Sequence, residues 1–339
     1  MVSDAALAAL PKAHLHLHLT GGMRHATLVE LADRYGVRLP ERLVEPAIDD
    51  WKLLGWPRFQ RLYDLARSVL RTADDISRLI REIAEDELAA GSRWCELQVT
   101  PTGYATRLGD VVTAMEVFTD AVADAERHTG VGMRLIVAAN RTRPAWEAEQ
   151  LARLGARFAD RGVVGFGLSN DERTGRVDDF VKAFRIAREH GLIAVPHAGE
   201  LLGPDAVRRT LDELAPRRIG HGVRAAEDAN VLAALADAGV ACEVCPASNV
   251  ALGVFAGHAA VPLRAMEEAG VPVVLAADDP LLFGVGLVDQ YAAARDAHAY
   301  TAADLAKLAR AAVEHSTMPS ETKGGLLAEI GTWLSGVGR

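Results

Sequence analysis

The sequence has little cysteine, no excess of positive charge and no long apolar run, and each shortage excludes a class of protein. Its 339 residues include three cysteines, a low and odd number that does not indicate a disulfide framework. The net charge of −9 argues against nucleic-acid binding, which usually needs a basic surface. No apolar run approaches the roughly 20 residues that span a bilayer. We therefore expect no nucleic-acid partner and no membrane association.

The N-terminus does not resemble a secretion signal. The stretch MVSDAALAALPKA carries an early acidic residue and has no basic segment before an apolar run. Half of the residues are apolar, which allows a large core, and 24% are charged, which is typical of globular proteins. We expect a soluble cytoplasmic protein, and nothing in the sequence indicates a homo-oligomer.

Apolar runs of strand length alternate with longer helical patterns, as in βα units. Eight runs predict strands, at residues 13–19, 93–101, 133–140, 163–171, 193–200, 217–223, 241–249 and 271–280. Helical patterns lie between most of them, for example at 147–160, 178–190 and 227–238, and Gly191 and Gly239 stand where helices commonly end. We predict a single (β/α)8 barrel domain over residues 1–339. An open doubly wound sheet is less well supported, because no glycine-rich phosphate loop follows the first strand.

The segment 20–92 is too long for one crossover helix, so we predict a helical insertion after the first strand. It contains several helical patterns, including residues 76–90. Within it, residues 51–59 (WKLLGWPRF) are unusually aromatic. We interpret them as a candidate lid that brings Trp56 and Phe59 to the substrate. The alternative is a packed helical insertion without a gating role.

Two histidines at the end of the first predicted strand indicate half of a metal site. Residues i and i+2 of a strand point to the same face, so His16 and His18 present two imidazoles a few ångströms apart. Zinc favours nitrogen ligands in catalytic sites that keep one position for water. The alternative is two polar histidines inside a barrel layer. We expect His14 to point to the same face one layer deeper and to be structural.

Two further strand ends carry groups suited to proton transfer. His197 ends an apolar strand and offers a third ligand. Glu200, three residues later, faces the same cavity, where a carboxyl group near an apolar wall holds its proton and acts as a general acid. The alternative is a helix-capping carboxylate. His221, between two glycines, suits a general base, and the alternative is a histidine in a turn.

Two adjacent acids, Asp278 and Asp279, follow the last predicted strand. Side chains of neighbouring strand residues diverge, so one of them would bind the metal and the other would face the substrate. A solvated turn is the alternative. Together with the histidines and Glu200, these acids end four different strands, and a (β/α)8 barrel places its chemistry at those ends.

The motifs HLHLTG, HAGE, RIGHG, CPASN and DDP, in this order and spacing, resemble those of the adenosine deaminase family of amidohydrolase barrels. The resemblance extends over roughly residues 11–335. It implies one Zn²⁺ per chain, held by His16, His18, His197 and Asp278, with Asp278 also counted as catalytic. It further implies a hydrolytic deaminase in which zinc-activated hydroxide attacks C6 of a 6-aminopurine and ammonia is released.

The same resemblance assigns the other roles around the purine ring. Glu200 would donate a proton to N1, His221 would be the base that handles the zinc-bound water, and Asp279 would bind N7. One metal is favoured over two, because the fourth predicted strand, residues 163–171, has no lysine to carry a bridge. The Cys242–Cys245 pair lacks the H-x-E partner of the other zinc deaminases, so we interpret its cysteines as buried strand residues.

The sequence departs from the family pattern on the sugar side of the substrate. Thr20 stands where the family has an acid that meets the ribose. Asn170 stands where the family has a glycine whose backbone faces purine N3, and Ala276-Ala277 replaces a polar pair. The small-molecule partner is therefore a 6-aminopurine whose identity stays open. Adenosine, 2′-deoxyadenosine, adenine, a 5′-modified adenosine such as 6-aminodeoxyfutalosine and an N6-substituted purine are the candidates.

Two other functions fit the pattern less well. A mononuclear zinc amidohydrolase acting on a different amidine or cyclic amide would use the same zinc and acid. A non-catalytic protein on a deaminase scaffold would be expected to lack a metal ligand, and no ligand is missing from this sequence.

Overall fold

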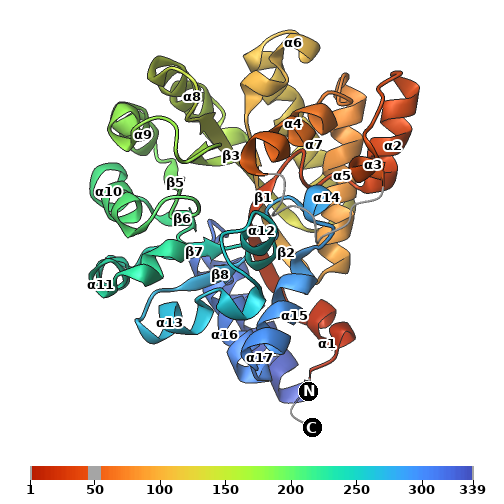
Figure 1. The fold of residues 1–339 in the computed structure, drawn as a ribbon. Coiled ribbons are helices and arrows are strands. Elements are labelled where there is room, and N and C mark those ends of the chain that lie inside the picture. Colours follow the sequence, from red (N-terminus) through yellow and green to blue (C-terminus); the bar gives the residue numbers. More distant parts are fainter. Residues whose placement is uncertain (1, 45–54, 338–339) are drawn as a thin grey trace.

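A computed structural model describes residues 2–44 and 55–337, and eight strands form its centre (Figure 1). Each strand pairs in parallel with the next one along the chain, which is the order of a (β/α)8 barrel. The predicted fold is therefore confirmed. The strands are β1 (Lys12–His18), β2 (Ser92–Val99), β3 (Gly132–Asn140), β4 (Val163–Ser169), β5 (Ile193–Ala198), β6 (Arg218–His221), β7 (Ala241–Val244) and β8 (Val273–Leu275).

Helices surround the strands, and Figure 1 shows α8 to α11 following one another along one side of the barrel. No helix within residues 2–44 and 55–337 is long and apolar enough to cross a membrane. The α-helices are α1 (Asp4–Ala9), α2 (His25–Arg34), α3 (Glu41–Val44), α4 (Gly55–Arg67), α5 (Ala73–Ala89), α6 (Ala105–Leu108), α7 (Val111–Thr129), α8 (Ala145–Arg157), α9 (Val181–Glu189), α10 (Pro204–Leu214), α11 (Ala229–Asp237), α12 (Pro246–Ala251), α13 (Leu263–Glu268), α14 (Pro280–Phe283), α15 (Leu287–His298), α16 (Ala302–His315) and α17 (Ser320–Val337).

The predicted insertion after the first strand contains α2 to α5. Helix α5 shows how the sequence sets these elements. The Thr72 hydroxyl accepts a hydrogen bond from the Asp75 backbone N–H, and the Asp75 carboxylate accepts one from Thr72 N–H, so the first turn is capped in both directions. Ile76 and Ile80 are among the apolar residues that α5 buries on one face. This face packs into the core between the barrel and its outer helices.

The eight predicted strands all exist, but all except the run 133–140 end earlier than predicted, and the difference is largest for the last two. The run 241–249 stops at Val244, because Pro246 begins α12, where its fixed φ and missing N–H suit the first helical turn. In the run 271–280 the strand ends at Leu275, and the two acids follow in the loop. Gly191 and Gly239 adopt the left-handed conformation just after α9 and α11, as predicted.

The barrel closes where its first and last strands meet. One isolated parallel bridge joins Leu17 to Asp278. His18 N–H donates to the Asp278 carbonyl at 3.0 Å, and Asp278 N–H donates to the His16 carbonyl at 3.1 Å. Three of the predicted site residues therefore lie at the closure of the barrel.

The expectation that His14 shares a face with His16 and His18 is wrong. The pairing of β1 with β2 shifts register between His14 and Leu17, so the alternation of side chains is interrupted there. His14 Nδ1 lies 2.7 Å from Glu87 of α5, outside the strands, and its Nε2 accepts from Ala277 N–H at 3.0 Å. Both ring nitrogens are thus bonded, which supports the structural role expected for this residue.

Candidate active site

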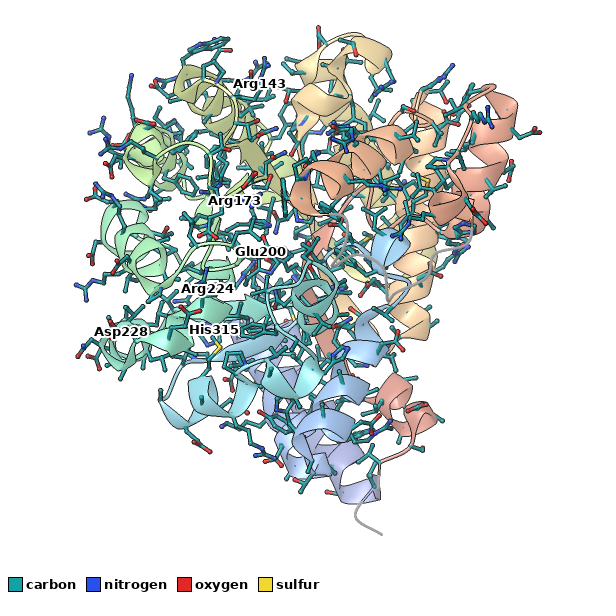
Figure 2. All side chains as sticks on the ribbon, viewed as in Figure 1. Arg143, Arg173, Glu200, Arg224, Asp228 and His315 are labelled. Atoms are coloured by element: carbon teal, nitrogen blue, oxygen red, sulfur yellow. The ribbon has the colours of Figure 1, made fainter. Side chains whose placement is uncertain are left out.

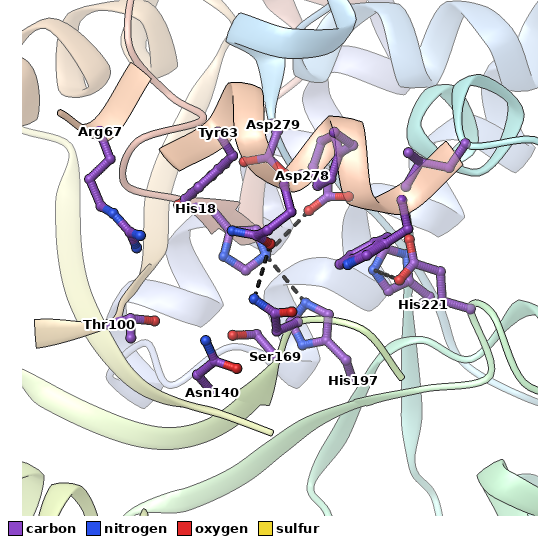
Figure 3. Close-up of a pocket in the computed structure, with 16 residues that line it drawn as sticks. His18, Tyr63, Arg67, Thr100, Asn140, Ser169, His197, His221, Asp278 and Asp279 are labelled. Carbon is purple, nitrogen blue, oxygen red and sulfur yellow. Dashed lines mark hydrogen bonds and ion pairs between the residues drawn. The ribbon is translucent and has the colours of Figure 1, made fainter. Parts of the chain in front are cut away.

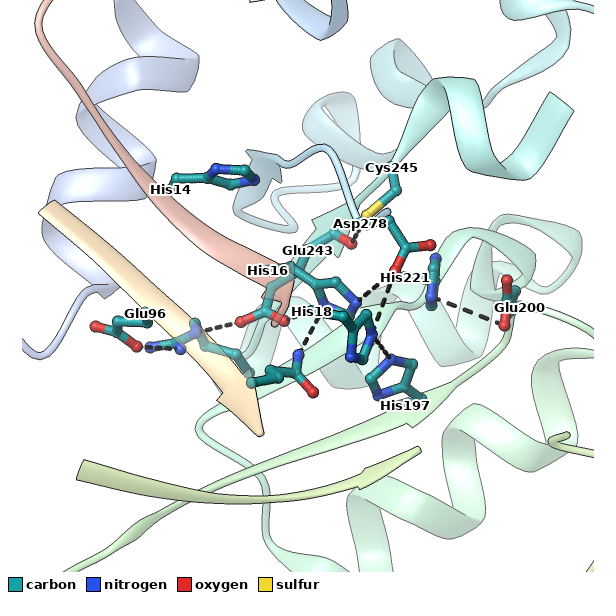
Figure 4. A network of polar contacts seen from close by, with 12 residues as sticks. His14, His16, His18, Glu96, His197, Glu200, His221, Glu243, Cys245 and Asp278 are labelled. Atoms are coloured by element: carbon teal, nitrogen blue, oxygen red, sulfur yellow. Dashed lines mark hydrogen bonds and ion pairs between the residues drawn. The ribbon is translucent and has the colours of Figure 1, made fainter. Parts of the chain in front are cut away.

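The site residues from four different strands converge inside the barrel mouth (Figures 2 and 4). His16 and His18 lie on β1, His197 lies on β5, and His221 is the last residue of β6. Glu200 follows β5, and Figure 2 shows it near the centre of the molecule. In Figure 4 the imidazoles of His16, His18 and His197 surround one point next to Asp278, while His14 lies apart.

Three distances among four side-chain atoms match those between the ligands of a tetrahedral metal site. His18 Nε2 lies 3.2 Å from His197 Nε2 and 3.3 Å from Asp278 Oδ1, and His16 Nε2 lies 3.4 Å from the same oxygen. Ligands bound at about 2.0–2.1 Å in a tetrahedron are about 3.3 Å apart. His16 Nε2 is buried and has no hydrogen-bond partner among the described residues. These four residues therefore fit a divalent metal ion.

The charges around His16 also favour a cation at this point. Burial by itself lowers the pKa of His16, but the nearby carboxylates of Asp278 and Glu243 outweigh it and raise that pKa to about 10. The raised pKa means that the surroundings favour a positive charge at this imidazole. A metal ion at Nε2 would supply that charge without a proton.

A buried chain of ionic contacts fixes the ring of His16. Its Nδ1 lies 2.7 Å from Glu243 Oε2, which orients Nε2 toward the other ligands. Arg218 donates from Nε to Glu243 at 2.5 Å and from Nη2 to Glu96 at 2.5 Å, and the side chains of all three residues are fully buried. Sequence reasoning missed this support, although charged residues inside otherwise apolar strands were a visible signal.

Asp278 is held by its backbone and by a hydroxyl. It adopts a left-handed φ of 65°, which non-glycine residues rarely adopt. Ser248 Oγ donates to its Oδ2 at 2.7 Å and leaves Oδ1 facing the histidines. Ser248 belongs to the CPASN motif, whose role was not predicted from the sequence.

Glu200 and His221 lie side by side next to the metal ligands. His221 Nε2 is 3.8 Å from Glu200 Oε2, and both side chains are almost completely buried. Burial, followed by the charges of Asp278 and Glu172, raises the pKa of Glu200 well above its ordinary value. Burial lowers the pKa of His221 to about 3. The pair thus combines a carboxyl group that holds its proton with a neutral imidazole.

One carboxylate anchors the loop that carries Glu200. Glu172 Oε1 accepts from Gly199 N–H at 2.6 Å. Its Oε2 accepts from the N–H groups of Glu200, Leu201 and Leu202 at 3.0, 2.7 and 2.9 Å. The sequence analysis left open that Glu200 caps a helix with its carboxylate. The structure gives this role no support, because Glu172 accepts the backbone N–H groups of residues 199–202. Sequence reasoning missed Glu172, which precedes the loop by a whole helix.

Asp279 points into the same cavity with an unused oxygen. Its Oδ1 is buried and has no hydrogen-bond partner in the part of the chain that the structure describes. Burial, followed by the charges of Asp278 and Glu200, raises the pKa of Asp279 well above its ordinary value, although His16 opposes this. A Cβ on Gly21 would lie 1.9 Å from Oδ1, so only glycine leaves room for this carboxyl group.

The cavity next to the metal ligands is lined by both aromatic and polar side chains (Figure 3). Trp56 and Phe59 of α4, which the sequence analysis proposed as substrate contacts, line this cavity. Residues 51–54 of the candidate lid lie outside the described residues. The full lining is His18, Trp56, Phe59, Gln60, Tyr63, Arg67, Thr100, Asn140, Ser169, Asn170, His197, Glu200, His221, Leu252, Asp278 and Asp279.

The two positions that depart from the family pattern differ in their placement. Asn170 lines the cavity with a left-handed φ of 81°, a conformation that favours glycine and that asparagine tolerates. Its Nδ2 donates to Gln60 Oε1 at 3.0 Å, so its side chain forms part of the wall. Thr20 is fully buried, and its Oγ1 lies 2.7 Å from the Tyr104 hydroxyl. It is not among the residues that line the cavity, so its predicted contact with substrate has no support in this geometry.

Comparison with known proteins identifies the family of this chain. The sequence pattern described as adenosine deaminase matches residues 11–333, nearly the whole chain. The chain belongs to the adenosine deaminase family. It is therefore a hydrolase that acts on carbon–nitrogen bonds of cyclic amidines.

Three similar proteins illustrate the relationship. A Streptomyces coelicolor protein with the provisional name adenosine/adenine deaminase is 58% identical over 332 residues, which cover 96% of this chain and 97% of that one. The crystal structure of an adenine deaminase from Arthrobacter aurescens superposes with a TM-score of 0.89 at 29% identity, over 96% of this chain and all of the other. An amidohydrolase from Burkholderia ambifaria, solved with bound zinc, has a TM-score of 0.87 at 26% identity, over 99% and 93% of the two chains.

Proposed function

We propose that this member of the adenosine deaminase family is a zinc-dependent hydrolytic deaminase of a 6-aminopurine base or nucleoside. Water replaces the amino group at C6, which leaves a 6-oxopurine and ammonia. The observation that carries the proposal is the close approach of His16, His18, His197 and Asp278 directly beside two groups for proton transfer. Zinc, when bound, supplies a Lewis acid that lowers the pKa of a water molecule.

The chain's own residues supply the proton transfers. Glu200, whose raised pKa keeps its carboxyl group protonated, donates to N1 and makes C6 more electrophilic. His221, neutral because its pKa is low, accepts the proton that the attacking water must lose. Asn249 Nδ2 lies 3.3 Å from His221 Nδ1 and orients the imidazole with Nε2 toward Glu200.

Asp279 recognises the ring that Glu200 activates. Purine N7 is a hydrogen-bond acceptor, so a carboxyl group can bind it only in the protonated form. The raised pKa of Asp279 and its unpartnered buried oxygen supply that form. With N1 at Glu200 and N7 at Asp279, the substrate has one orientation in which C6 faces the metal ligands.

Ammonia release from a panel of purines tests the proposal. Purified protein loaded with zinc is incubated with adenine, adenosine, 2′-deoxyadenosine, a 5′-modified adenosine and an N6-substituted purine, and ammonia and the change in ultraviolet absorbance are followed. We expect at least one substrate to yield its 6-oxopurine with one ammonia per turnover. The Glu200→Gln variant serves as the inactive control, and no release from any compound would overturn the proposal.

A second measurement separates a purine substrate from another cyclic amidine. Asp279→Ala removes the proposed partner of N7 and leaves the four metal ligands in place. We expect kcat/KM for the best purine to fall about 10- to 100-fold, the usual scale for a lost hydrogen bond to a charged or reacting group. Unchanged kcat/KM, with unchanged zinc content, would favour a substrate without a purine ring.

A further inference from the structure

A second cavity lies on the face of β1 that points away from the metal ligands. Leu17 stands between His16 and His18, so its side chain points to the opposite face of the strand, where it lines this cavity. The other walls come from the C-terminal half of α5 and the first turn of α15. None of these residues lines the catalytic cavity. We call this second cavity, with Leu17, Glu87 and Val288 in its walls, the outer cleft.

The outer cleft combines apolar walls with negative charge. Ile83 of α5 and Val288 of α15 contribute apolar side chains. The acids in its walls are Asp86, Glu87 and Asp289, and no lysine or arginine of residues 2–44 and 55–337 lines it. The cleft encloses about 800 Å³, including its open mouth, which is ample for a chain of several carbons. Its chemistry therefore suits a ligand with a positive end and an apolar body.

Glu87 has a buried oxygen that no described residue binds. Its side chain is 8% exposed, and Oε1 lies 2.7 Å from His14 Nδ1. His14 Nε2 accepts from Ala277 N–H, so the ring proton is on Nδ1 and is donated to Glu87. Oε2 is buried and has no hydrogen-bond partner in the part of the chain that the structure describes. A buried carboxylate oxygen is costly unless it is paired, so this oxygen points to a ligand.

Lys12, whose charge interacts with Glu87, does not fill this gap. An ammonium group has three N–H donors, and those of Lys12 point to backbone carbonyls. Nζ donates to Leu7 O at 2.9 Å, to Leu10 O at 2.8 Å and to Ala90 O. Burial lowers the pKa of Lys12 to about 7, although the charge of Glu87 opposes this. At neutral pH the lysine therefore balances only part of the charge of Glu87.

The end of α5 adds to the negative potential in the outer cleft. Ala89, the last residue of this 17-residue helix, lines the cleft, and a helix C-terminus carries a partial negative charge. The last turn contains no basic residue and holds both Asp86 and Glu87. Acids at a helix C-terminus are unfavourable by themselves, so this arrangement favours a bound cation.

We propose that the outer cleft binds a linear aliphatic amine, with its ammonium group on Glu87 Oε2 and its carbon chain along Ile83 and Val288. An ammonium group supplies both the missing donor and the missing charge, and the chain covers the apolar walls. A bare metal ion would meet one free carboxylate oxygen beside apolar side chains, which is too few ligands for it. Asp289, on the other helix of the cleft, offers a carboxylate to a second ammonium group, so a diamine should bind more tightly than a monoamine.

Calorimetric titration of the zinc-loaded holoenzyme with butylamine and 1,4-diaminobutane tests the proposal. The titrations are made at neutral pH and constant ionic strength, and 1-butanol is the uncharged probe of the same shape. We expect one butylamine per chain, bound at least about 10-fold more tightly than 1-butanol, as for a charge-assisted hydrogen bond. The melting temperature should rise with either amine. No binding and no stabilisation at millimolar amine would overturn the proposal, and so would equal affinity for 1-butanol.

Variants in the two helices locate the bound amine. Glu87→Gln keeps the shape of the side chain and should weaken butylamine binding about 10- to 100-fold. Glu85→Gln is the matched control, because Glu85 belongs to the same helix, pairs with Arg24 and does not line the outer cleft. Val288→Trp fills the cleft without altering Glu87 or its bond to His14, and it should weaken binding as well. Wild-type affinity in either variant would contradict the proposed site.

The catalytic cavity also contains acids, and Asp279→Ala distinguishes the two cavities. This variant should bind butylamine with wild-type affinity, because Asp279 lines only the catalytic cavity. A loss as large as that of Glu87→Gln would place the amine beside the metal ligands and overturn the proposal. Calorimetry needs no turnover, so each of these results is independent of the deaminase activity.

Discussion

A single carboxylate, that of Glu172, accepts four backbone N–H groups of the loop that carries Glu200, and replacing Glu172 by glutamine should show how far catalysis depends on these bonds. Glu172 accepts four backbone hydrogen bonds from residues 199–202, one through Oε1 and three through Oε2. A glutamine of the same shape has one acceptor oxygen. Whichever way its amide lies, an NH2 group faces backbone N–H groups that had been hydrogen-bonded.

The two orientations of the glutamine amide lose different numbers of hydrogen bonds, and we estimate the change in stability from the orientation that loses fewer. If the amide oxygen takes the place of Oε2, three bonds persist and the bond from Gly199 N–H is lost. A hydrogen bond to a charged group contributes about 1.5–3 kcal/mol, so we expect the free energy of unfolding to fall by about that amount. Arg224 still donates hydrogen bonds to the carbonyls of Gly199 and Leu201, but the N–H of Gly199 loses its acceptor, so we expect the neighbouring Glu200 to shift. A shift of about 1 Å in a catalytic group can cost roughly 100-fold in rate.

The assay compares Glu172→Gln with wild type for three quantities: the melting temperature, the zinc content and the kcat for the best purine. We expect a melting temperature several degrees lower, unchanged zinc content and a kcat reduced about 10- to 100-fold. Glu147→Gln is the control. Glu147 is also a buried glutamate, but it lies in the first turn of α8 and accepts a hydrogen bond from Arg143, just before that helix. A Glu172→Gln enzyme with wild-type kcat would refute the reasoning, even if it melted earlier.

Three further predictions concern the proton donor and the metal. Glu200→Gln should keep its zinc and lose about 100-fold or more in kcat, measured by ammonia release, and a variant without zinc would contradict its role as an acid. Because burial raises the pKa of Glu200, its protonated form is present below that pKa, so kcat/KM should fall as pH rises through it. Ser248→Ala frees Asp278 Oδ2, and in competition with a chelator we expect zinc to bind about 10- to 100-fold more weakly. Ser335→Ala is the control and should match wild type, because the Ser335 hydroxyl is exposed and bonds only to the Gly331 carbonyl within α17.

The sequence predicts the barrel, and it predicts which side chains meet at the barrel mouth, because both leave local patterns. Each strand is a short apolar run, and each ligand stands at the end of one, so order along the chain translates directly into position around the barrel. His197 and His221 could be placed in one site by this rule alone. The ends of β7 and β8 were less predictable, because the apolar pattern continues past Val244 and Leu275 although the strands stop there.

What the sequence does not reveal are contacts between distant residues. The register shift in β1 turns His14 outward, and nothing in the alternating pattern AHLHLHL signals it. Glu172 and Ser248 act on residues far along the chain, and their side chains are ordinary in any local window. Glu87 lies on a helix that looks amphipathic and unremarkable until the fold brings it to the outer cleft.

Because the metal ligands lie where the barrel closes, a bound ion would affect the stability of the fold as well as catalysis. His16, His18 and Asp278 belong to the two segments where the ring of strands meets itself, and a single bridge joins those segments. An ion bound by all three would cross-link the segment after the N-terminus to the segment that follows β8. When the ion is removed, the amide hydrogens of His18 and Asp278 should exchange with solvent before those of the seven strand pairs elsewhere in the ring. Metal supply would then govern how long the folded protein survives as well as whether it turns over substrate.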